Sequence, residues 1–126
     1  MEMIIGGAFQ GKSAYAENKY PGTCWVQGSD IEEDTLLSAR GVLGFHEYIR
    51  RELKAGHDVK HLAKKLMGQN PDVILVSDEV GCGVVPVDAF DRAYREAVGR
   101  VCTELAAFSK KVTRVTCGIG MVIKDA

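Results

Sequence analysis

Apolar residues along this chain gather in short runs separated by polar and glycine-rich segments. The run at 72–77 contains the unbroken branched sequence Val-Ile-Leu-Val, and the run at 1–5 leads directly into glycines. Runs of this kind are typical of strands covered on both faces, as in a parallel sheet. Four segments bounded by turn residues are therefore predicted to be strands: 1–5, 23–27, 72–77 and 112–117.

Other segments repeat their apolar residues at the three- to four-residue spacing of an amphipathic helix. These predicted helical segments are 13–19, 30–54, 59–67 and 88–110. Ser29 or Asp30 is the expected cap of the second one, and Gly41 and Gly44 weaken its middle, which leaves a break into two helices open. Gly99 lies inside the last one, where glycine costs about 1 kcal/mol relative to alanine, and indicates a close packing contact.

Strands and helices thus alternate along the chain, which predicts an α/β fold with a mostly parallel sheet flanked by helices. A length of 126 residues is typical of one domain with a substantial core, so residues 1–126 are expected to form a single domain.

Composition restricts the function classes. The formal net charge is −1, so the chain has no strong field for nucleic acid or an anionic membrane, and any phosphate must be bound by a local structure. No run is long enough to cross a bilayer and no targeting segment is visible. A cytoplasmic protein is therefore expected, in which the four cysteines stay reduced.

One segment carries a specific chemical signal. Residues 6–13 read Gly6-Gly7-Ala8-Phe9-Gln10-Gly11-Lys12-Ser13 and match G-x-x-x-x-G-K-[ST] at every fixed position. The glycines let backbone N–H groups turn toward phosphate oxygens, and the following helix adds the positive end of its dipole. Lys12 is expected to bridge the β- and γ-phosphates of ATP or GTP, and Ser13 to supply a hydroxyl ligand to Mg²⁺. The motif predicts a P-loop NTPase-like fold.

A P-loop also requires an acidic group near the magnesium ion, usually at the end of a neighbouring apolar strand. Asp78 and Glu79 follow the predicted strand at 72–77 directly. Either of them is a candidate metal ligand, and the other is a candidate for positioning or deprotonating the attacking hydroxyl group.

Two other motifs are weaker. Residues 78–81 fit the D-x-x-G of regulatory GTPases, but no N-K-x-D follows them, which disfavours that class. His57 and His61 have a four-residue spacing that can bind a metal, but no third ligand lies nearby in the sequence, so a solvated basic face is favoured.

Three segments in the second half of the chain match the pattern of one enzyme family. Residues 73–86 are similar to a family strand followed by N/D-E-V-G-x-G-I-V-P, and residues 92–101 to a helix with R-x-[FY]-R-D-x-x-G-R-V-N. Residues 112–124 are similar to the ending V-x-x-V-x-x-G-I-G. Together with the P-loop, these segments resemble the adenosylcobinamide kinase / adenosylcobinamide-phosphate guanylyltransferase family.

The resemblance implies a transferase of cobalamin biosynthesis. Members of the family phosphorylate the aminopropanol hydroxyl of adenosylcobinamide with ATP or GTP, and many then transfer GMP to that phosphate through a guanylylated histidine. The resemblance implies that Lys12 and Glu79 are catalytic, that a corrinoid is the second substrate, and that the protein is a homo-oligomer, as members typically are.

Two alignments differ in where they place the family histidine. The family pattern is similar to H-R-x-x-R-P, and its counterpart in one alignment is His46, which is followed by Arg50 but lacks the neighbouring arginine and the proline. A second alignment places residues 23–30 on a later family strand and leaves the histidine segment out. His46 is therefore a candidate guanylylated nucleophile, and a helix residue without chemistry is the alternative.

Two further functions remain open because the chain is short between the P-loop helix and residue 73. One is a catalytically degenerate nucleotide-binding or regulatory module, which would bind nucleotide without turnover. The other is a kinase of a different small molecule, which a screen of phosphate acceptors would distinguish.

Overall fold

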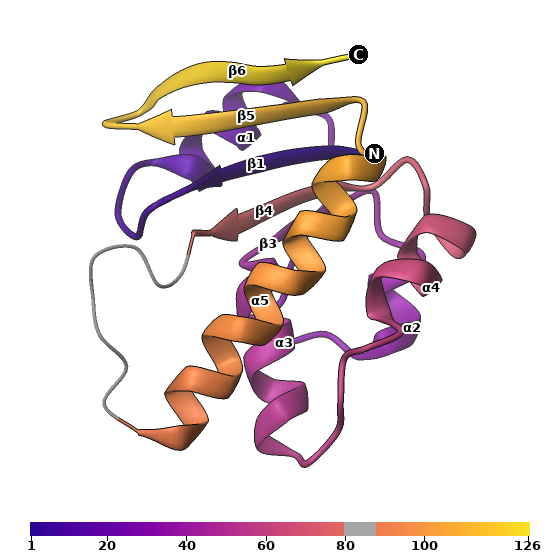
Figure 1. The fold of residues 1–126 in the computed structure, drawn as a ribbon. Coiled ribbons are helices and arrows are strands. Elements are labelled where there is room, and N and C mark those ends of the chain that lie inside the picture. Colours follow the sequence, from indigo (N-terminus) through magenta and orange to yellow (C-terminus); the bar gives the residue numbers. More distant parts are fainter. Residues whose placement is uncertain (80–87) are drawn as a thin grey trace.

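The computed structural model describes residues 1–79 and 88–126. Within them the strands form one sheet in the order β2-β3-β4-β1-β5-β6 (Figure 1). The neighbours from β2 to β5 run parallel, and β6 pairs with β5 in the antiparallel direction. The strands are β1 (Glu2–Gly6), β2 (Trp25–Gln27), β3 (Gly41–Leu43), β4 (Ile74–Asp78), β5 (Lys111–Thr116) and β6 (Ile119–Asp125). The α/β fold class and the mostly parallel sheet are thus confirmed.

Helices cover both faces of the sheet. They are α1 (Lys12–Lys19), α2 (Glu33–Leu36), α3 (Phe45–Lys54), α4 (Leu62–Gln69) and α5 (Ala89–Phe108). Figure 1 shows α1 behind β1 and β5, whereas α5 crosses the opposite face together with α2, α3 and α4. No helix in the described parts of the chain is long and apolar enough to cross a membrane.

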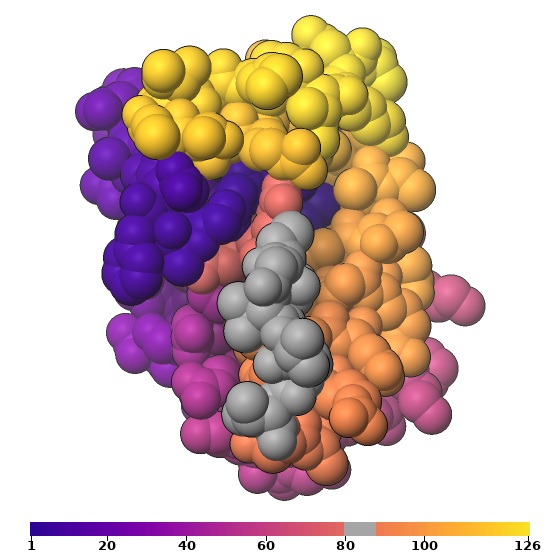
Figure 2. All heavy atoms as spheres, turned by 60° about the vertical axis from the view of Figure 1, so that its left-hand side comes forward, coloured from indigo at the N-terminus to yellow at the C-terminus, as the bar shows by residue number. Residues whose placement is uncertain are grey.

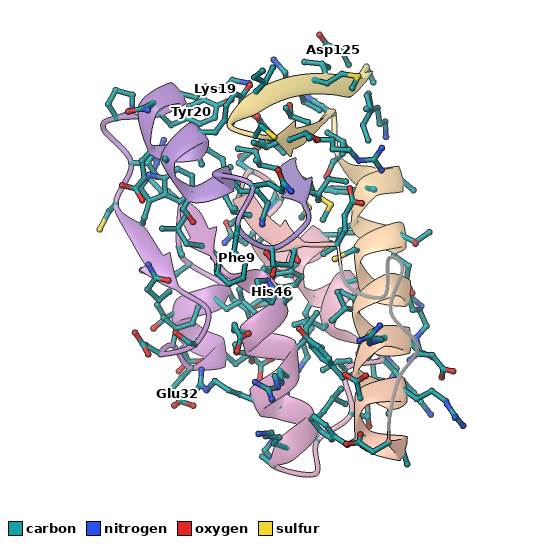
Figure 3. All side chains as sticks on the ribbon, turned by 90° about the vertical axis from the view of Figure 1, so that its left-hand side faces the viewer. Phe9, Lys19, Tyr20, Glu32, His46 and Asp125 are labelled. Carbon is teal, nitrogen blue, oxygen red and sulfur yellow. The ribbon has the colours of Figure 1, made fainter. Side chains whose placement is uncertain are left out.

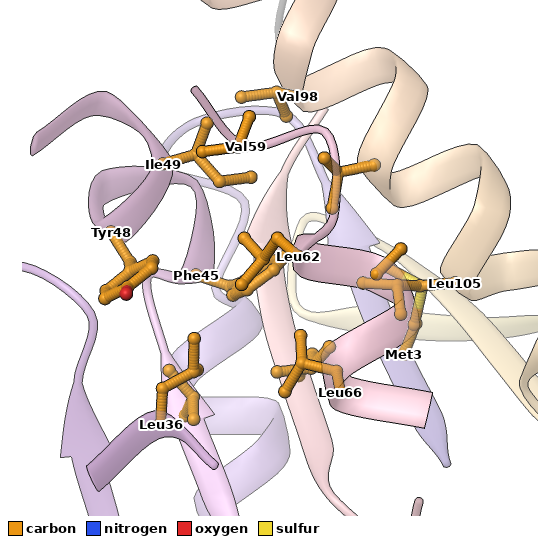
Figure 4. Packing of buried hydrophobic residues seen from close by; sticks show 14 of the residues in the cluster. Met3, Leu36, Phe45, Tyr48, Ile49, Val59, Leu62, Leu66, Val98 and Leu105 are labelled. Carbon is orange, nitrogen blue, oxygen red and sulfur yellow. The ribbon is translucent and has the colours of Figure 1, made fainter. Parts of the chain in front are cut away.

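The strand alternation of β1 explains why there are two apolar cores. Met3 packs with the α5 side of the sheet, in a cluster that includes Leu105, while its neighbour Ile4 packs with Ala16 of α1. All four side chains are fully buried or nearly so. Figure 4 shows the larger cluster, which includes Phe45 of α3 and Leu66 of α4. Burying a large apolar side chain stabilises the fold by about 1.5–3 kcal/mol.

One sequence-based prediction was wrong. Residues 30–54 do not form a helix from the start, because 41–43 form the buried strand β3 between β2 and β4. The helical spacing of apolar residues holds only from Phe45 onward, where α3 begins. The short helix α2 begins at Glu33 with Glu32 at its N-cap, so neither Ser29 nor Asp30 is the cap.

The expected close contact at Gly99 is also absent. A Cβ atom built on Gly99 meets no atom of the described residues within 4 Å, so this glycine of α5 faces open space rather than a packed neighbour. The remaining helix predictions hold: α1 and α5 lie where expected, and Asp88 caps α5 by accepting the Asp91 N–H at 2.6 Å. The glycine-rich segment at 80–86 lies outside the described residues.

The C-terminal strand β6 was not anticipated. It forms an edge of the sheet and leaves large apolar side chains exposed, with Ile119 at 72% and Met121 at 60%. Figure 2 shows this segment along one rim of the molecule. An exposed apolar edge strand is uncommon in a protein that stays monomeric.

Candidate active site at the carboxyl end of the sheet

The glycine-rich loop lies between β1 and α1, as the sequence predicted. β1 ends at Gly6, and a Cβ atom there would stand 2.5 Å from the Val115 carbonyl oxygen, so only glycine fits. Gly11 has a φ of 84° and precedes α1, and Phe9 has a φ of 62° with a fully exposed side chain. The loop therefore turns sharply through left-handed conformations and directs the N-terminus of α1 toward the carboxyl end of the sheet.

The turn between β5 and β6 anchors this loop. The Gln10 carbonyl oxygen accepts the Gly118 N–H at 2.8 Å, and the Gln10 side-chain oxygen accepts the Cys117 N–H at 2.7 Å. Sequence analysis placed Gln10 in the motif but gave no reason for its side chain. The structure supplies one, because Gln10 joins two segments that lie far apart in the sequence.

Lys12 folds back over the loop toward Asp78. Its Nζ donates to the Gly7 carbonyl oxygen at 2.7 Å and forms an ion pair with Asp78 Oδ1 at 2.6 Å. The Lys12 side chain is only 8% exposed, so the ammonium group is held in a partly desolvated position where a charge-assisted contact is strong. The predicted lysine and one of the two predicted acids therefore meet.

His46 belongs to the same group of side chains (Figure 3). β3 ends at Leu43, Gly44 turns the chain at a φ of 66°, and α3 starts at once, which places His46 at the carboxyl edge of the sheet. Its Nδ1 accepts the Asp78 backbone N–H at 3.0 Å. β4 extends beyond its pairing with β3, so the imidazole takes the place of a strand partner there.

The surroundings of His46 favour a neutral ring. Burial lowers its pKa, and the nearby Lys12 ammonium acts in the same direction, while Asp78 and Glu47 oppose them. Because Nδ1 accepts a hydrogen bond, the neutral ring carries its proton on Nε2. Nε2 lies 3.4 Å from Asp78 Oδ2 and 3.6 Å from Glu47 Oε1.

These side chains line one cavity of about 330 Å³, which is bounded by the loop, the start of α1, Gly44, His46 and the end of β4. Ser13 and Asp78 both line it, and a hydroxyl with a carboxylate is the hard oxygen donor set that Mg²⁺ prefers. Mg²⁺ takes few protein ligands and keeps water or phosphate oxygens as the others. These residues therefore fit the expected ion.

Glu79 is directed away from this cavity. β4 ends at Asp78, whose carboxylate contacts Lys12, and Glu79 is the residue that follows the strand. There the Glu79 carboxylate accepts from Arg114 Nε at 2.7 Å and lines a second cavity of about 240 Å³. Sequence analysis treated the two acids as interchangeable, and it missed Arg114 altogether.

The other histidine pair lies far from this edge. The exposed His57 contacts Glu52 Oε2 at 2.8 Å through Nδ1, and His61 stands at the start of α4. Among the described residues no group of three or more histidine, cysteine or acidic side chains is arranged to hold a metal ion. Both histidines are exposed, which agrees with the predicted solvated face, although His57 contacts an acidic side chain there.

The fold and the glycine-rich loop together define the class of protein. A mostly parallel sheet whose central strand leads through G-x-x-x-x-G-K-S into a helix is the architecture of P-loop nucleotide-binding proteins. The family model described as cobinamide kinase / cobinamide phosphate guanyltransferase matches residues 23–123, and the chain belongs to this family. The match begins after the glycine-rich loop, so loop motif and family match are independent observations.

Two curated relatives bear the same name. The chain is 46% identical over 52 residues to the bifunctional adenosylcobalamin biosynthesis protein CobU of Escherichia coli (strain K12) and, to the same extent, to that of Salmonella typhimurium (strain LT2). The aligned part is 41% of this chain and 29% of each relative. The similarity to these proteins thus spans less than a third of their length.

Proposed function

We propose that this protein transfers the γ-phosphoryl group of ATP or GTP to a hydroxyl group of a cobinamide in cobalamin biosynthesis. The observation that carries the proposal is the contact of Lys12 with Asp78 beside the glycine-rich loop, in a chain of this family. In a P-loop site the lysine binds the β- and γ-phosphates, and the loop N–H groups and the α1 dipole add to the attraction. Nucleotide would thus replace the Gly7 carbonyl as a partner of Lys12.

The proposed transfer requires one base. The acceptor oxygen forms a bond to the γ-phosphorus, the bond from this phosphorus to the β–γ bridging oxygen breaks, and the nucleoside diphosphate leaves with that electron pair. The hydroxyl proton passes to the Glu79 carboxylate, which Arg114 orients. Ser13 and Asp78 would hold Mg²⁺, which neutralises phosphate charge when bound.

Guanylyl transfer is a second candidate because His46 lines the same cavity as Lys12. Nε2 would attack the α-phosphorus in the tautomer that carries the ring proton on Nδ1, so Nδ1 would first have to release the Asp78 N–H. A bond from Nε2 to the α-phosphorus then forms, the bond from this phosphorus to the α–β bridging oxygen breaks, diphosphate leaves with that electron pair, and the Nδ1 proton passes to water. The resting geometry favours a different role, in which His46 positions Asp78. In this positioning role Asp78 and His46 act as one unit.

The proposal also covers the cellular compartment, the oligomeric state and the absence of nucleic acid among the expected partners. The described cysteines, Cys24, Cys102 and Cys117, are free thiols, which fits the reducing cytoplasm where nucleoside triphosphates are abundant. The exposed apolar strand β6 supports a homo-oligomer in which this edge is covered by another copy. With a net charge of −1, nucleic acid is not an expected partner.

The test incubates the protein with Mg²⁺, cobinamide, and ATP or GTP carrying label in the α- or γ-phosphate. We expect γ-label on the corrinoid.

In Lys12→Ala a hydrogen bond to charged phosphate worth about 1.5–3 kcal/mol is lost, so nucleotide affinity should fall roughly ten- to a hundredfold. α-Label on the protein that disappears in His46→Asn would support guanylylation. Nucleotide binding without movement of either label contradicts the transferase and favours the regulatory module, and γ-label on another acceptor indicates a different kinase.

A further inference from the structure

A second cavity lies on the opposite face of the same sheet edge, between the strands and α5. Its volume is about 240 Å³, and its walls are mostly apolar, with Met3 and Ile5 from β1, Val112 from β5, and Val98 and Cys102 from α5. Burial raises the Cys102 pKa to about 11, so this thiol is a neutral part of the wall. The cavity is smaller than a typical pocket for a drug-sized ligand, so it suits one arm of a larger molecule.

The charged groups that line this cavity, among the described residues, are Asp78 and Glu79. Asp78 is paired with Lys12 and Glu79 with Arg114, but neither cation lines the cavity. The described lining therefore offers a phosphate group no positive charge, which makes the cavity unsuitable as a second nucleotide site. The two carboxylates favour a neutral arm that can donate a hydrogen bond, as a hydroxyl group does. The chemistry of the walls therefore selects an aliphatic arm that carries a hydroxyl group at or near its end.

The two cavities meet at the end of β4. Asp78 lines both the cavity with Lys12 and the cavity with Glu79. Phosphoryl transfer requires the attacking and leaving oxygens on opposite sides of the phosphorus, roughly in line. A nucleotide held on the α1 side of the edge and an acceptor held on the α5 side satisfy this requirement.

We propose that the cavity between α5 and strands β1, β4 and β5 binds the hydroxyl-bearing arm of the phosphate acceptor. This inference rests on the proposed kinase function and adds to it the place and chemistry of the acceptor site. The body of a corrinoid is too large for the cavity, so it remains outside and only the arm enters, with its hydroxyl group at Glu79.

Gly99 provides a direct way to test this site. It lies in α5, it lines the cavity, and a Cβ atom built there meets nothing within 4 Å among the described residues. A leucine at this position projects into the space proposed for the arm without a backbone clash. Gly68 is a matched control, because it is an exposed glycine of α4 with equally open surroundings and does not line the cavity.

The experiment compares Gly99→Leu, Gly68→Leu and the unmodified protein in phosphoryl transfer from γ-labelled GTP to cobinamide. We expect Gly99→Leu to raise the acceptor KM at least tenfold, while the nucleotide Kd stays within twofold and Gly68→Leu behaves as the unmodified protein does. The second variant Thr103→Leu, one turn further along the cavity wall, should have the same effect and covers the case that Gly99→Leu does not fold. Unchanged acceptor KM values in the folded variants would overturn the acceptor site and leave the proposed function intact.

Failure of the proposed function is recognised separately. If the unmodified protein transfers no label, binding of cobinamide alone is measured by ultrafiltration, using the corrinoid colour. Retention by the unmodified protein and by Gly68→Leu, but not by Gly99→Leu, would support the cavity as a corrinoid site without kinase activity. Equal retention by all three proteins, or retention by none, overturns the inference.

Discussion

At the scale of single residues, the site is organised around Asp78. Its carboxylate contacts Lys12 at 2.6 Å and its backbone N–H binds the His46 ring at 3.0 Å. The sequence predicted Lys12 and Asp78 as candidates because a P-loop requires a lysine and an acid, and it offered His46 through the family resemblance. It did not predict the contacts, since 66 and 32 positions separate Asp78 from the two partners and only the strand order brings them together.

The partly buried His46 makes stability depend on pH. Its pKa is lowered in the folded protein, so between pH 6.5 and that lower value the unfolded chain binds more protons. The free energy of unfolding therefore falls as the pH drops below about 6.5. Above that pH the His46 ring is neutral in both states and no longer makes stability depend on pH. We expect His46→Asn, which keeps an acceptor for the Asp78 N–H, to lose less stability between pH 7 and pH 5 in urea unfolding.

The exposed His61 supplies the control for this measurement. The variant His61→Asn should retain the pH dependence of the unmodified protein, because position 61 is exposed and lies outside the group formed by His46, Asp78 and Lys12. A pH dependence of His46→Asn equal to that of the unmodified protein would show that the ring is not the group that titrates.

At the scale of elements, sequence patterns predicted the long elements well and the short ones poorly. The strands β1, β4 and β5 and the helix α5 have strong patterns, and all of them were placed correctly. β3 has three residues, starts with a glycine and lies between apolar helical positions, so local pattern could not separate it from a helix. It is a strand because tertiary pairing with β2 and β4 overrides local propensity.

The glycine that opens β3 is needed for packing. A Cβ atom on Gly41 would stand 2.5 Å from ring carbons of Trp25 and 3.0 Å from Thr23 Cγ2. We expect Gly41→Ala to lower the free energy of unfolding by about 1–3 kcal/mol, the usual cost of overpacking, as measured by urea denaturation. Gly22→Ala is the control, because its Cβ meets nothing within 4 Å in the described structure and should change stability little. An equal effect of both variants would refute the packing explanation.

At the scale of the whole molecule, the edge strand β6 is the feature from which we expect a homo-oligomer. Exposed apolar side chains on an edge strand promote pairing with another chain, and Ile119 and Met121 are both more than half exposed. We expect Met121→Lys to shift the protein toward the monomer in light scattering coupled to size exclusion. Gln69→Lys adds the same charge at the end of α4 and should leave the mass unchanged. A monomeric unmodified protein, or an unchanged mass of Met121→Lys, contradicts this expectation.

The central position of β1 has a consequence for the newly made chain. Among the described strands β1 is synthesised first, yet its partners β4 and β5 begin at residues 74 and 111, and Gln10 is anchored by residues 117 and 118. At roughly 5–20 residues per second, the glycine-rich loop leaves the ribosome several seconds before its supports exist. A nascent chain can therefore shape its glycine-rich loop only after residues 117 and 118 have been made, and a chain interrupted before β5 has the complete P-loop sequence without the structure that shapes it.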